Sequence, residues 1–180
     1  MRSIVLTGGD HAGKTTLVEA FRSEGCAIVP EAALRVIADL NREHGVDGQR
    51  TWRQQNWSEF QARVARTQHR LEAEARESGA RAVVLDRGLP DGIAFCRLEG
   101  AALPLELQRG VRERYDHVLL LETIKPFAPR SETGRLGGFE RSLALHDLLR
   151  QVYEELGYAP DPLPLQPVAE RMQRIRALLD

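Results

Sequence analysis

Short apolar runs alternate with longer amphipathic stretches along the whole chain. The apolar runs have the length of buried strands and cover residues 2–7, 26–29, 82–85 and 118–121, with a weaker run in a proline-rich stretch at 163–165. Between them, the patterns and end signals of helices occur over residues 14–24, 31–44, 51–78, 91–98, 104–113, 140–156 and 168–179. Strands that alternate with helices indicate βαβ units, and hence an α/β protein with a parallel sheet and helices on both faces.

Local signals mark the ends of the helices. The glycines in residues 45–50 predict a loop. Thr51 and Gln54 have the spacing of a capping box, so the longest helix is expected to begin there and to run to about residue 78. Near its start, Trp52 and Trp57 are expected to pack in the core, with stacking on a substrate ring as the alternative.

The first apolar run leads directly into a phosphate-binding motif. Residues 8–15, GGDHAGKT, match the P-loop pattern GxxxxGK[ST], in which glycines let backbone amides turn toward a triphosphate at the N-terminus of a helix. Lys14 is expected to contact the β- and γ-phosphates, and Thr15 to ligate Mg²⁺. The residues expected to bind ATP are Gly8, Gly9, Asp10, His11, Ala12, Gly13, Lys14, Thr15 and Thr16.

Polar residues that directly follow apolar runs are candidates for the rest of the site, because ligands of parallel α/β sheets bind at the carboxyl ends of strands. Asp86 ends the third run and is expected on the Mg²⁺ side, the alternative being a turn or helix cap. Arg87 beside it could hold a substrate hydroxyl or phosphate, or be a surface arginine. Glu31 follows the second run and could take a proton from an attacking hydroxyl, or only complement a helix dipole.

Residues 123–139 differ in composition from the rest of the chain, with two prolines and three glycines. This composition predicts a mobile surface segment, which we interpret as a lid over the phosphates. Arg130 and Arg135 within it, and Arg141 just after it, could stabilise the negative charge of a transferred phosphoryl group. The alternative is that they are solvated loop charges.

Composition narrows the class of ligand. The chain of 180 residues suffices for one domain, expected to span 1–180, and carries 25 basic and 26 acidic side chains for a net charge of -1. This balance gives no general attraction for polyanions, so we expect a small-molecule acceptor and neither a nucleic-acid nor a membrane partner. No leader or bilayer-length apolar stretch is found, which predicts a cytoplasmic protein. Cys26 and Cys96 are expected to be buried, and the five histidines have no metal-ligand spacing.

Four segments together resemble a known family. They are TGGDHAGKTTL, VPEAA after the second run, VVLDRGLPDGIAFC after the third, and the arginine-bearing lid that leads into YEELGY. They are similar to the P-loop kinase-like AAA ATPases related to ribosylnicotinamide kinase and to nucleoside and nucleotide kinases. The resemblance implies a three-layer α/β/α P-loop NTPase fold, with a five-stranded parallel sheet in the order 2-3-1-4-5 and a lid. It also implies Glu31 as general base and Arg87 as an assisting residue.

Three hypotheses of function follow. The first is a phosphotransferase that uses ATP and Mg²⁺ and moves the γ-phosphate to a nucleoside, a nucleotide or a related metabolite. The second is a nucleotide-dependent ATPase or switch that acts through a protein partner, although no [NT]KxD guanine signature occurs in the chain. The third, phosphorylation of nucleic-acid 5′ ends, needs a basic groove that the neutral composition does not require. The identity of the acceptor and the oligomeric state are left open.

Overall fold

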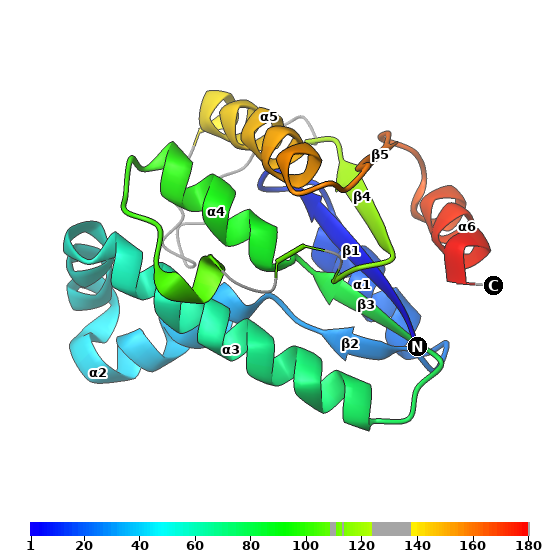
Figure 1. Cartoon of the computed structure of the whole chain (residues 1–180), viewed down its shortest axis with the longest axis horizontal. Helices are drawn as coiled ribbons and strands as arrows, with labels where there is room; N and C mark the ends of the chain where they lie inside the picture. The colour runs from blue at the N-terminus through cyan, green and yellow to red at the C-terminus, as the bar shows by residue number, and fades with distance from the viewer. Residues whose placement is uncertain (109–110, 113, 124–137, 180) are drawn as a thin grey trace.

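The computed structural model describes residues 1–108, 111–112, 114–123 and 138–179. The strands are β1 (Arg2–Gly8), β2 (Ala27–Val29), β3 (Ala82–Asp86), β4 (His117–Leu121) and β5 (Asp161–Leu163). The α-helices are α1 (Lys14–Arg22), α2 (Ala32–Gln55), α3 (Trp57–Glu77), α4 (Leu89–Leu98), α5 (Phe139–Glu155) and α6 (Val168–Leu179), and a single 3-10 turn, η1 (Leu105–Leu107), precedes β4 in these ranges. Figure 1 shows their arrangement around the sheet.

The described strands form one parallel sheet in the order β2-β3-β1-β4-β5. This confirms the order that the family resemblance implies. Leu6 of β1 pairs with Asp86 of β3, and Gly8 pairs with Leu121 of β4. The carboxyl ends of β1, β2 and β3 therefore meet at one edge of the sheet, which brings the segments that follow them together.

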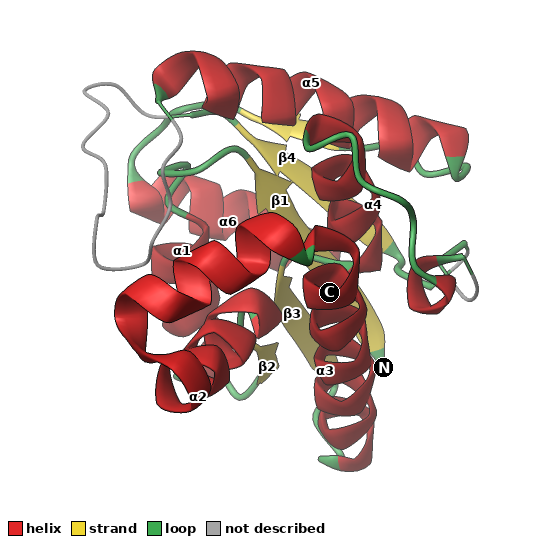
Figure 2. Ribbon diagram, turned by 90° about the vertical axis from the view of Figure 1, so that its left-hand side faces the viewer, coloured by secondary structure: helices red, strands yellow, loops and turns green. Residues whose placement is uncertain are grey.

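Side chains that alternate along the strands build a core on each face of the sheet. On one face, the buried cluster against α1 and α6 includes Ile4, Leu6, Leu17, Phe21 and Ile175. On the other face, the cluster against α3, α4 and α5 includes Val5, Leu85, Leu71, Ala94 and Leu149. Figure 2 shows helices on both sides of the strands. The three-layer α/β/α fold is confirmed, because every central strand is covered on both faces, as parallel sheets require.

The predicted loop at residues 45–50 is wrong. Only Gly45 leaves helical geometry, with φ 72° and ψ 170°, and the chain continues as helix on both sides of it. The predicted capping box is also wrong, since the Thr51 hydroxyl donates a hydrogen bond to the carbonyl of Asp47 inside α2. The break between α2 and α3 falls at Asn56 instead. One glycine interrupts the helix for a single residue, and the helix then continues to Gln55, with Gln49 and Arg53 buried.

Two further elements differ from the prediction. In the described part of residues 104–113, helical geometry is confined to the short turn η1. Strand β5 begins at Asp161 rather than Leu163, and Pro162 fits because β5 lies at the edge of the sheet, where a missing backbone N–H is tolerated. Among the described residues, no helix has the length and apolar character needed to cross a membrane.

Candidate active site

The P-loop follows β1 directly and ends where α1 begins. Gly8 has φ 141°, and a Cβ on it would lie 2.4 Å from the carbonyl oxygen of Leu121, so only glycine fits there. The Lys14 ammonium donates hydrogen bonds to the carbonyls of Gly8 at 3.1 Å and Gly9 at 2.7 Å. The lysine thus lies over the loop that is expected to bind phosphates, at the positive end of α1.

The charge of Lys14 is tuned by its surroundings. Burial, followed by the nearby Arg87 guanidinium, lowers the pKa of Lys14 to about 8, against the opposing attraction of Asp86, Glu31 and Asp10. The ammonium form therefore still predominates at neutral pH. A buried cation in this position attracts negative phosphate oxygens more strongly than a solvated one, because little water screens it.

Thr15 and Asp86 form the second part of the phosphate site. The Thr15 hydroxyl donates to Asp86 Oδ2 at 2.7 Å, whereas the buried Asp86 Oδ1 has no hydrogen-bond partner among the described residues. Burial, and next the neighbouring Glu31 carboxylate, raise the pKa of Asp86. A cation beside Oδ1 would offset both effects.

The donor set at this point fits Mg²⁺. This ion is held in phosphate sites by one or two protein oxygens, with phosphate and water oxygens completing an octahedron. The Thr15 hydroxyl and the Asp86 carboxylate supply such oxygens beside the P-loop. In the described ranges, no group of three or more His, Cys, Asp and Glu side chains could hold a metal ion. Two protein oxygens at this point leave the other positions of an octahedron to phosphate and water oxygens, as for a nucleotide-bound Mg²⁺.

Arg87 lies buried between the P-loop and the end of β2. Its guanidinium donates to the Gly8 carbonyl at 3.1 Å, to Asp91 Oδ1 at 2.9 Å and to Asp10 Oδ1 at 3.3 Å, and its Nε lies 3.5 Å from Glu31 Oε1. Burial disfavours this cation, but the carboxylates around it, Glu31 foremost, raise the pKa of Arg87 above its usual value. Arg87 is therefore permanently charged and is not a surface arginine.

The same contacts account for the unusual acidic residue of the loop. Asp10 would introduce a negative charge where a triphosphate is expected to bind, which opposes binding. Its carboxylate instead meets the guanidinium of Arg87 at 3.3 Å, and its carbonyl accepts a hydrogen bond from the Ser142 hydroxyl of α5 at 3.2 Å. Asp10 thus links the P-loop to Arg87 and to α5.

A cavity of about 450 Å³ adjoins the P-loop. It lies among α2, α3, α4 and α5, and both Glu31 and Arg87 lie in its wall. Glu31 immediately precedes α2 and is 6% exposed. Residues that contribute rings, amides or charges to the wall include Arg53, Trp57, Phe60, Gln61 and Phe95. The cavity thus combines apolar surface with a few polar groups, as small-molecule sites do.

The two tryptophans differ in their positions. Trp52 packs with His44 and Arg63, with its ring centroid 6.1 Å from that of His44 and 4.8 Å from the Arg63 guanidinium carbon. Trp57 packs against Phe60 and also lines the cavity. Core packing is therefore the role of Trp52, whereas Trp57 combines packing with a position from which it could contact a ligand.

The remaining predicted residues lie at the border of the site. His11 has φ 60°, Ala12 is buried, and Thr16 is exposed on the first turn of α1. Arg141 lines the cavity and forms an ion pair with Glu99. Arg130 and Arg135 belong to residues 124–137, which lie outside the described part of the chain, and their predicted role stays a prediction.

A comparison with models of protein families found a match. Residues 3–171 match the model of a family described as an AAA domain. The chain belongs to this AAA-domain family. The match covers the P-loop, Glu31, Asp86 and Arg87, and the family resemblance expected from the sequence is confirmed. A search of curated proteins gave no match.

Solved structures share the fold of this AAA-domain protein at low sequence identity. Deoxyadenosine kinase from M. mycoides, with dCMP and a flexible dCDP bound, is 15% identical, with a TM-score of 0.63 over 98% of both chains. Thymidylate kinase from Ehrlichia chaffeensis is 13% identical, with a TM-score of 0.62 over 99% of this chain and 98% of that one. The NadR protein in complex with NAD and AMP-PNP is 18% identical, with a TM-score of 0.69, and here the chain covers 49% of NadR. The fold is that of nucleoside and nucleotide kinases.

Sequence reasoning missed several buried polar residues around the site of this AAA-domain protein. Asp91 accepts hydrogen bonds from Thr7, Arg87, the Gly88 amide and Tyr153. The side chains of Gln61, Gln68 and Glu72, each at most 4% exposed, lie on the inner face of α3. One signal was available: these three positions fall on the same helical face as the apolar residues of α3, so polar side chains occur where apolar ones are expected.

Proposed function

We propose that this AAA-domain protein is an ATP- and Mg²⁺-dependent kinase that transfers the γ-phosphate of ATP to a small molecule. The observation that carries the proposal is the cavity beside the P-loop, with Glu31 and Arg87 in its wall. A phosphate site next to a ligand-sized cavity suits a reaction of two substrates. An ATPase or switch needs the phosphate site but not the ligand-sized cavity.

On the donor side, the backbone amides of the P-loop and Lys14 would hold the triphosphate, and Thr15 and Asp86 would hold Mg²⁺. When bound, Mg²⁺ neutralises phosphate charge. Arg130 and Arg135 would stabilise the negative charge of the transferred phosphoryl group, as expected from the sequence.

On the acceptor side, Glu31 would receive the proton of the attacking hydroxyl. As the new bond between the acceptor oxygen and the γ-phosphorus forms, the bond from that phosphorus to the β–γ bridging oxygen breaks, and ADP leaves with the electron pair. Arg87 holds the Glu31 carboxylate at 3.5 Å, which fixes the direction in which it can accept a proton. An acceptor that is already phosphorylated would need less help from a base.

The cavity wall also limits the class of acceptor. The rings of Trp57, Phe60 and Phe95 offer apolar surface, and Gln61 and Arg53 offer polar groups. A flat ring with a polar edge fits this mixture. The neighbouring folds named deoxyadenosine kinase and thymidylate kinase support the same choice. We therefore propose a nucleoside, a nucleotide or a related metabolite as the acceptor.

A screen for acceptor-dependent ATP consumption tests the proposal. Wild-type protein is incubated with ATP, Mg²⁺ and one member of a panel of nucleosides, nucleotides and related metabolites, and ADP is measured, with Lys14→Ala as the inactive control. The proposal expects ADP to form rapidly with at least one acceptor and only slowly without any. Slow ADP formation that no acceptor stimulates, together with a protein partner bound only in the ATP state, would favour the ATPase or switch.

A further inference from the structure

The turn that joins β3 to α4 has a strained backbone. Arg87 has φ 75°, in the left-handed region that residues with a side chain rarely adopt. Such a conformation persists only where the surrounding structure holds it in place. The turn Arg87–Leu89 also directs the Arg87 guanidinium toward Glu31 and the P-loop. What holds the turn therefore decides where this cation lies.

Two side chains from other parts of the chain hold the backbone of the turn. Gln68 of α3 donates to the carbonyl of Arg87 at 3.3 Å. The hydroxyl of Tyr115, which precedes β4, accepts a hydrogen bond from the amide of Leu89 at 3.0 Å. The first and the last residue of the turn are thus each bound by a buried polar side chain.

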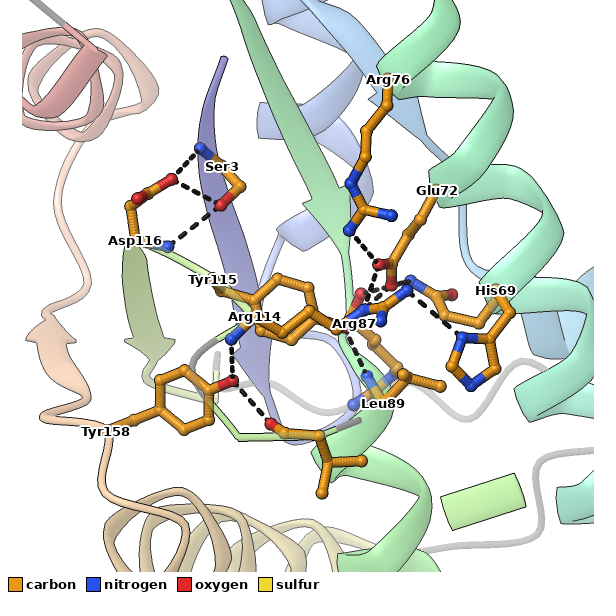
Figure 3. A network of polar contacts seen from close by, with 12 residues as sticks. Ser3, His69, Glu72, Arg76, Arg87, Leu89, Arg114, Tyr115, Asp116 and Tyr158 are labelled. Carbon is orange, nitrogen blue, oxygen red and sulfur yellow. Dashed lines mark hydrogen bonds and ion pairs between the residues drawn. The ribbon is translucent and has the colours of Figure 1, made fainter. Parts of the chain in front are cut away.

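Both side chains are bound in turn by the same carboxylate. Glu72 Oε1 accepts hydrogen bonds from Gln68 at 2.9 Å and from the Tyr115 hydroxyl at 2.8 Å. Its Oε2 accepts from Arg114 at 2.6 Å and from Arg76 at 3.4 Å. Figure 3 shows the carboxylate at the centre of this network, between α3 and the residues before β4.

The chemistry of Glu72 sets the direction of the hydrogen bonds. An ionised carboxylate only accepts, so the Tyr115 hydroxyl must donate to Glu72, and a lone pair of its oxygen stays available for the Leu89 amide. Burial, and next the charge of Glu72, raise the pKa of Tyr115 well above its usual value, so the phenol keeps its proton. The amide of Gln68 uses its nitrogen in both contacts, toward Glu72 and toward the Arg87 carbonyl.

Close packing adds to the hydrogen bonds. A Cβ on Gly88 would lie 2.8 Å from the Tyr153 hydroxyl and 2.9 Å from Cε2 of Tyr115. The glycine therefore lets both rings approach the middle of the turn directly. The Gly88 amide donates to Asp91 Oδ2 at 3.1 Å, so the middle residue of the turn is bound as well.

We propose that Gln68, Glu72 and Tyr115 form a positioning clamp that holds the Arg87–Leu89 turn and, through it, the Arg87 guanidinium against Glu31 and the P-loop. Its catalytic consequence rests on the function proposed above. Glu72 and Tyr115 lie outside the cavity lining, whereas Gln68 also forms part of it. The clamp acts on the reaction through Arg87. A buried carboxylate is costly to desolvate, and apolar side chains of similar volume could fill the same space. Its four hydrogen bonds instead fix the two groups that bind the turn.

A matched pair of variants tests the clamp. Tyr115→Phe removes the acceptor of the Leu89 amide and a donor to Glu72. The control Tyr158→Phe removes a neighbouring hydroxyl that accepts from the Arg114 amide at 3.0 Å and donates to Val111, without contact to the turn. Gln68→Met tests the other contact of the clamp at nearly constant volume. Thermal unfolding of each variant records any general loss of stability.

Two readouts separate positioning from stability. The first is NMR spectroscopy: in Tyr115→Phe the Leu89 amide should exchange with solvent about tenfold faster or more, and the Nε–H resonance of Arg87 should shift, whereas Tyr158→Phe should change neither. The second is turnover with the acceptor found in the screen. Tyr115→Phe and Gln68→Met should lower kcat about 10- to 100-fold, with the KM for ATP within about twofold of wild type. In an Arg87→Lys background, Tyr115→Phe should lower kcat little further.

The outcomes are decisive in both directions. An unchanged Arg87 Nε–H resonance in Tyr115→Phe and Gln68→Met overturns the clamp. A loss of kcat in Tyr115→Phe that is no larger than in Tyr158→Phe also overturns it. So does a loss of kcat in Tyr115→Phe that is fully additive with that of Arg87→Lys. Should the wild type phosphorylate none of the acceptors, the proposed function fails, and the NMR result alone then decides whether the clamp positions Arg87.

Discussion

At the scale of single residues, Arg87 is the point at which the charges of the site meet. Its guanidinium contacts the carboxylates of Asp10, Asp91 and Glu31 and the carbonyl of Gly8, all within 3.5 Å. One buried cation therefore orders a candidate base, a P-loop residue and the start of α4. The hydrogen bonds of the Lys14 ammonium, in contrast, go to the carbonyls of Gly8 and Gly9, so it can turn from them to phosphates.

Lys14 and Glu31 should differ in what their removal changes. Lys14→Ala should abolish nearly all turnover, because it removes the cation that is expected to bind the β- and γ-phosphates. Glu31→Gln should lower kcat about 100-fold or more and leave ATP affinity largely intact, because it removes only the proton acceptor. Steady-state kinetics and titration calorimetry with ATP measure both quantities. If Glu31→Gln weakened ATP binding as much as it slowed turnover, Glu31 would belong to the donor site instead.

Asp91 should be a stabilising residue of the site. It is 2% exposed, and its two oxygens accept four hydrogen bonds, two of them at 2.7 Å from Thr7 and Tyr153. Asp91→Asn turns one oxygen into a donor, so two donors lose their acceptor and Arg87 loses a counter-charge. We expect a loss of about 3 kcal/mol in the free energy of unfolding, measured with urea.

A carboxylate at the opposite end of the sheet provides the control for Asp91. Asp116 Oδ2 accepts from the amide and the hydroxyl of Ser3, both at 2.7 Å, at a more exposed position. Asp116→Asn keeps one oxygen that can accept both bonds, so we expect a loss of about 1 kcal/mol or less. Equal losses in the two variants would contradict the special role of Asp91.

At the scale of elements, the bend in α2 shapes the cavity. The helix starts at the end of β2, bends at Gly45 and continues to Gln55. Glu31, just before the helix, lies in the cavity wall. After the bend, the second half of the helix places Arg50 and Arg53 in the same wall. One helix thus contributes to both ends of the candidate acceptor site.

Gly45→Ala tests whether the bend is enforced. The backbone of Gly45, with φ 72° and ψ 170°, lies in a region that is essentially restricted to glycine, although a Cβ there would meet no atom within 4 Å. Backbone strain alone should therefore lower the free energy of unfolding by about 1–3 kcal/mol. In a regular helix the same substitution stabilises, by about 1 kcal/mol. A gain in stability would show that the helix runs straight through this position.

Helix α5 should carry a pH-dependent part of the stability. Burial lowers the pKa of His146 below its ordinary value of 6.5. His146 in the unfolded chain therefore takes up a proton at a higher pH than in the folded protein. The free energy of unfolding falls as the pH drops from 6.5 toward the folded pKa, and His146 does not change it above pH 6.5. In urea unfolding between about pH 7 and about pH 5, His146→Gln should show a smaller loss of stability than wild type. An equal loss in both proteins would place the titration elsewhere.

At the scale of the whole molecule, the sheet order explains why distant segments share one site. Strand β3 lies between β1 and β2, so the residues after β3 lie between the P-loop and Glu31. Parallel pairing aligns the carboxyl ends of the three strands. Helices α2, α3, α4 and α5 surround the cavity at that edge.

The parts of this arrangement that the sequence predicted are those with a strong local pattern. The P-loop and Glu31 follow strands β1 and β2, and Asp86 ends β3, so parallel topology alone brings them together. The apolar face of α3 signals that Gln68 and Glu72 are buried. Their place in the clamp could not be foreseen, because the sequence of a helix does not reveal which residues of other elements a buried polar side chain binds. The C-terminal end of α2 and the start of α3 were misplaced, because the glycines at residues 45–50 do not end the helix and only Gly45 leaves helical geometry.

The central claim is transfer of phosphate from ATP to a small molecule in the cavity beside the P-loop. The most direct test follows the γ-phosphate itself: wild-type protein, Mg²⁺ and ATP labelled at the γ-phosphate are incubated with the acceptor panel, and the products are analysed by mass spectrometry. The account predicts labelled acceptor and ADP in equal amounts, both absent with Lys14→Ala. Label found only in inorganic phosphate, released at the same rate with and without acceptors, would contradict it.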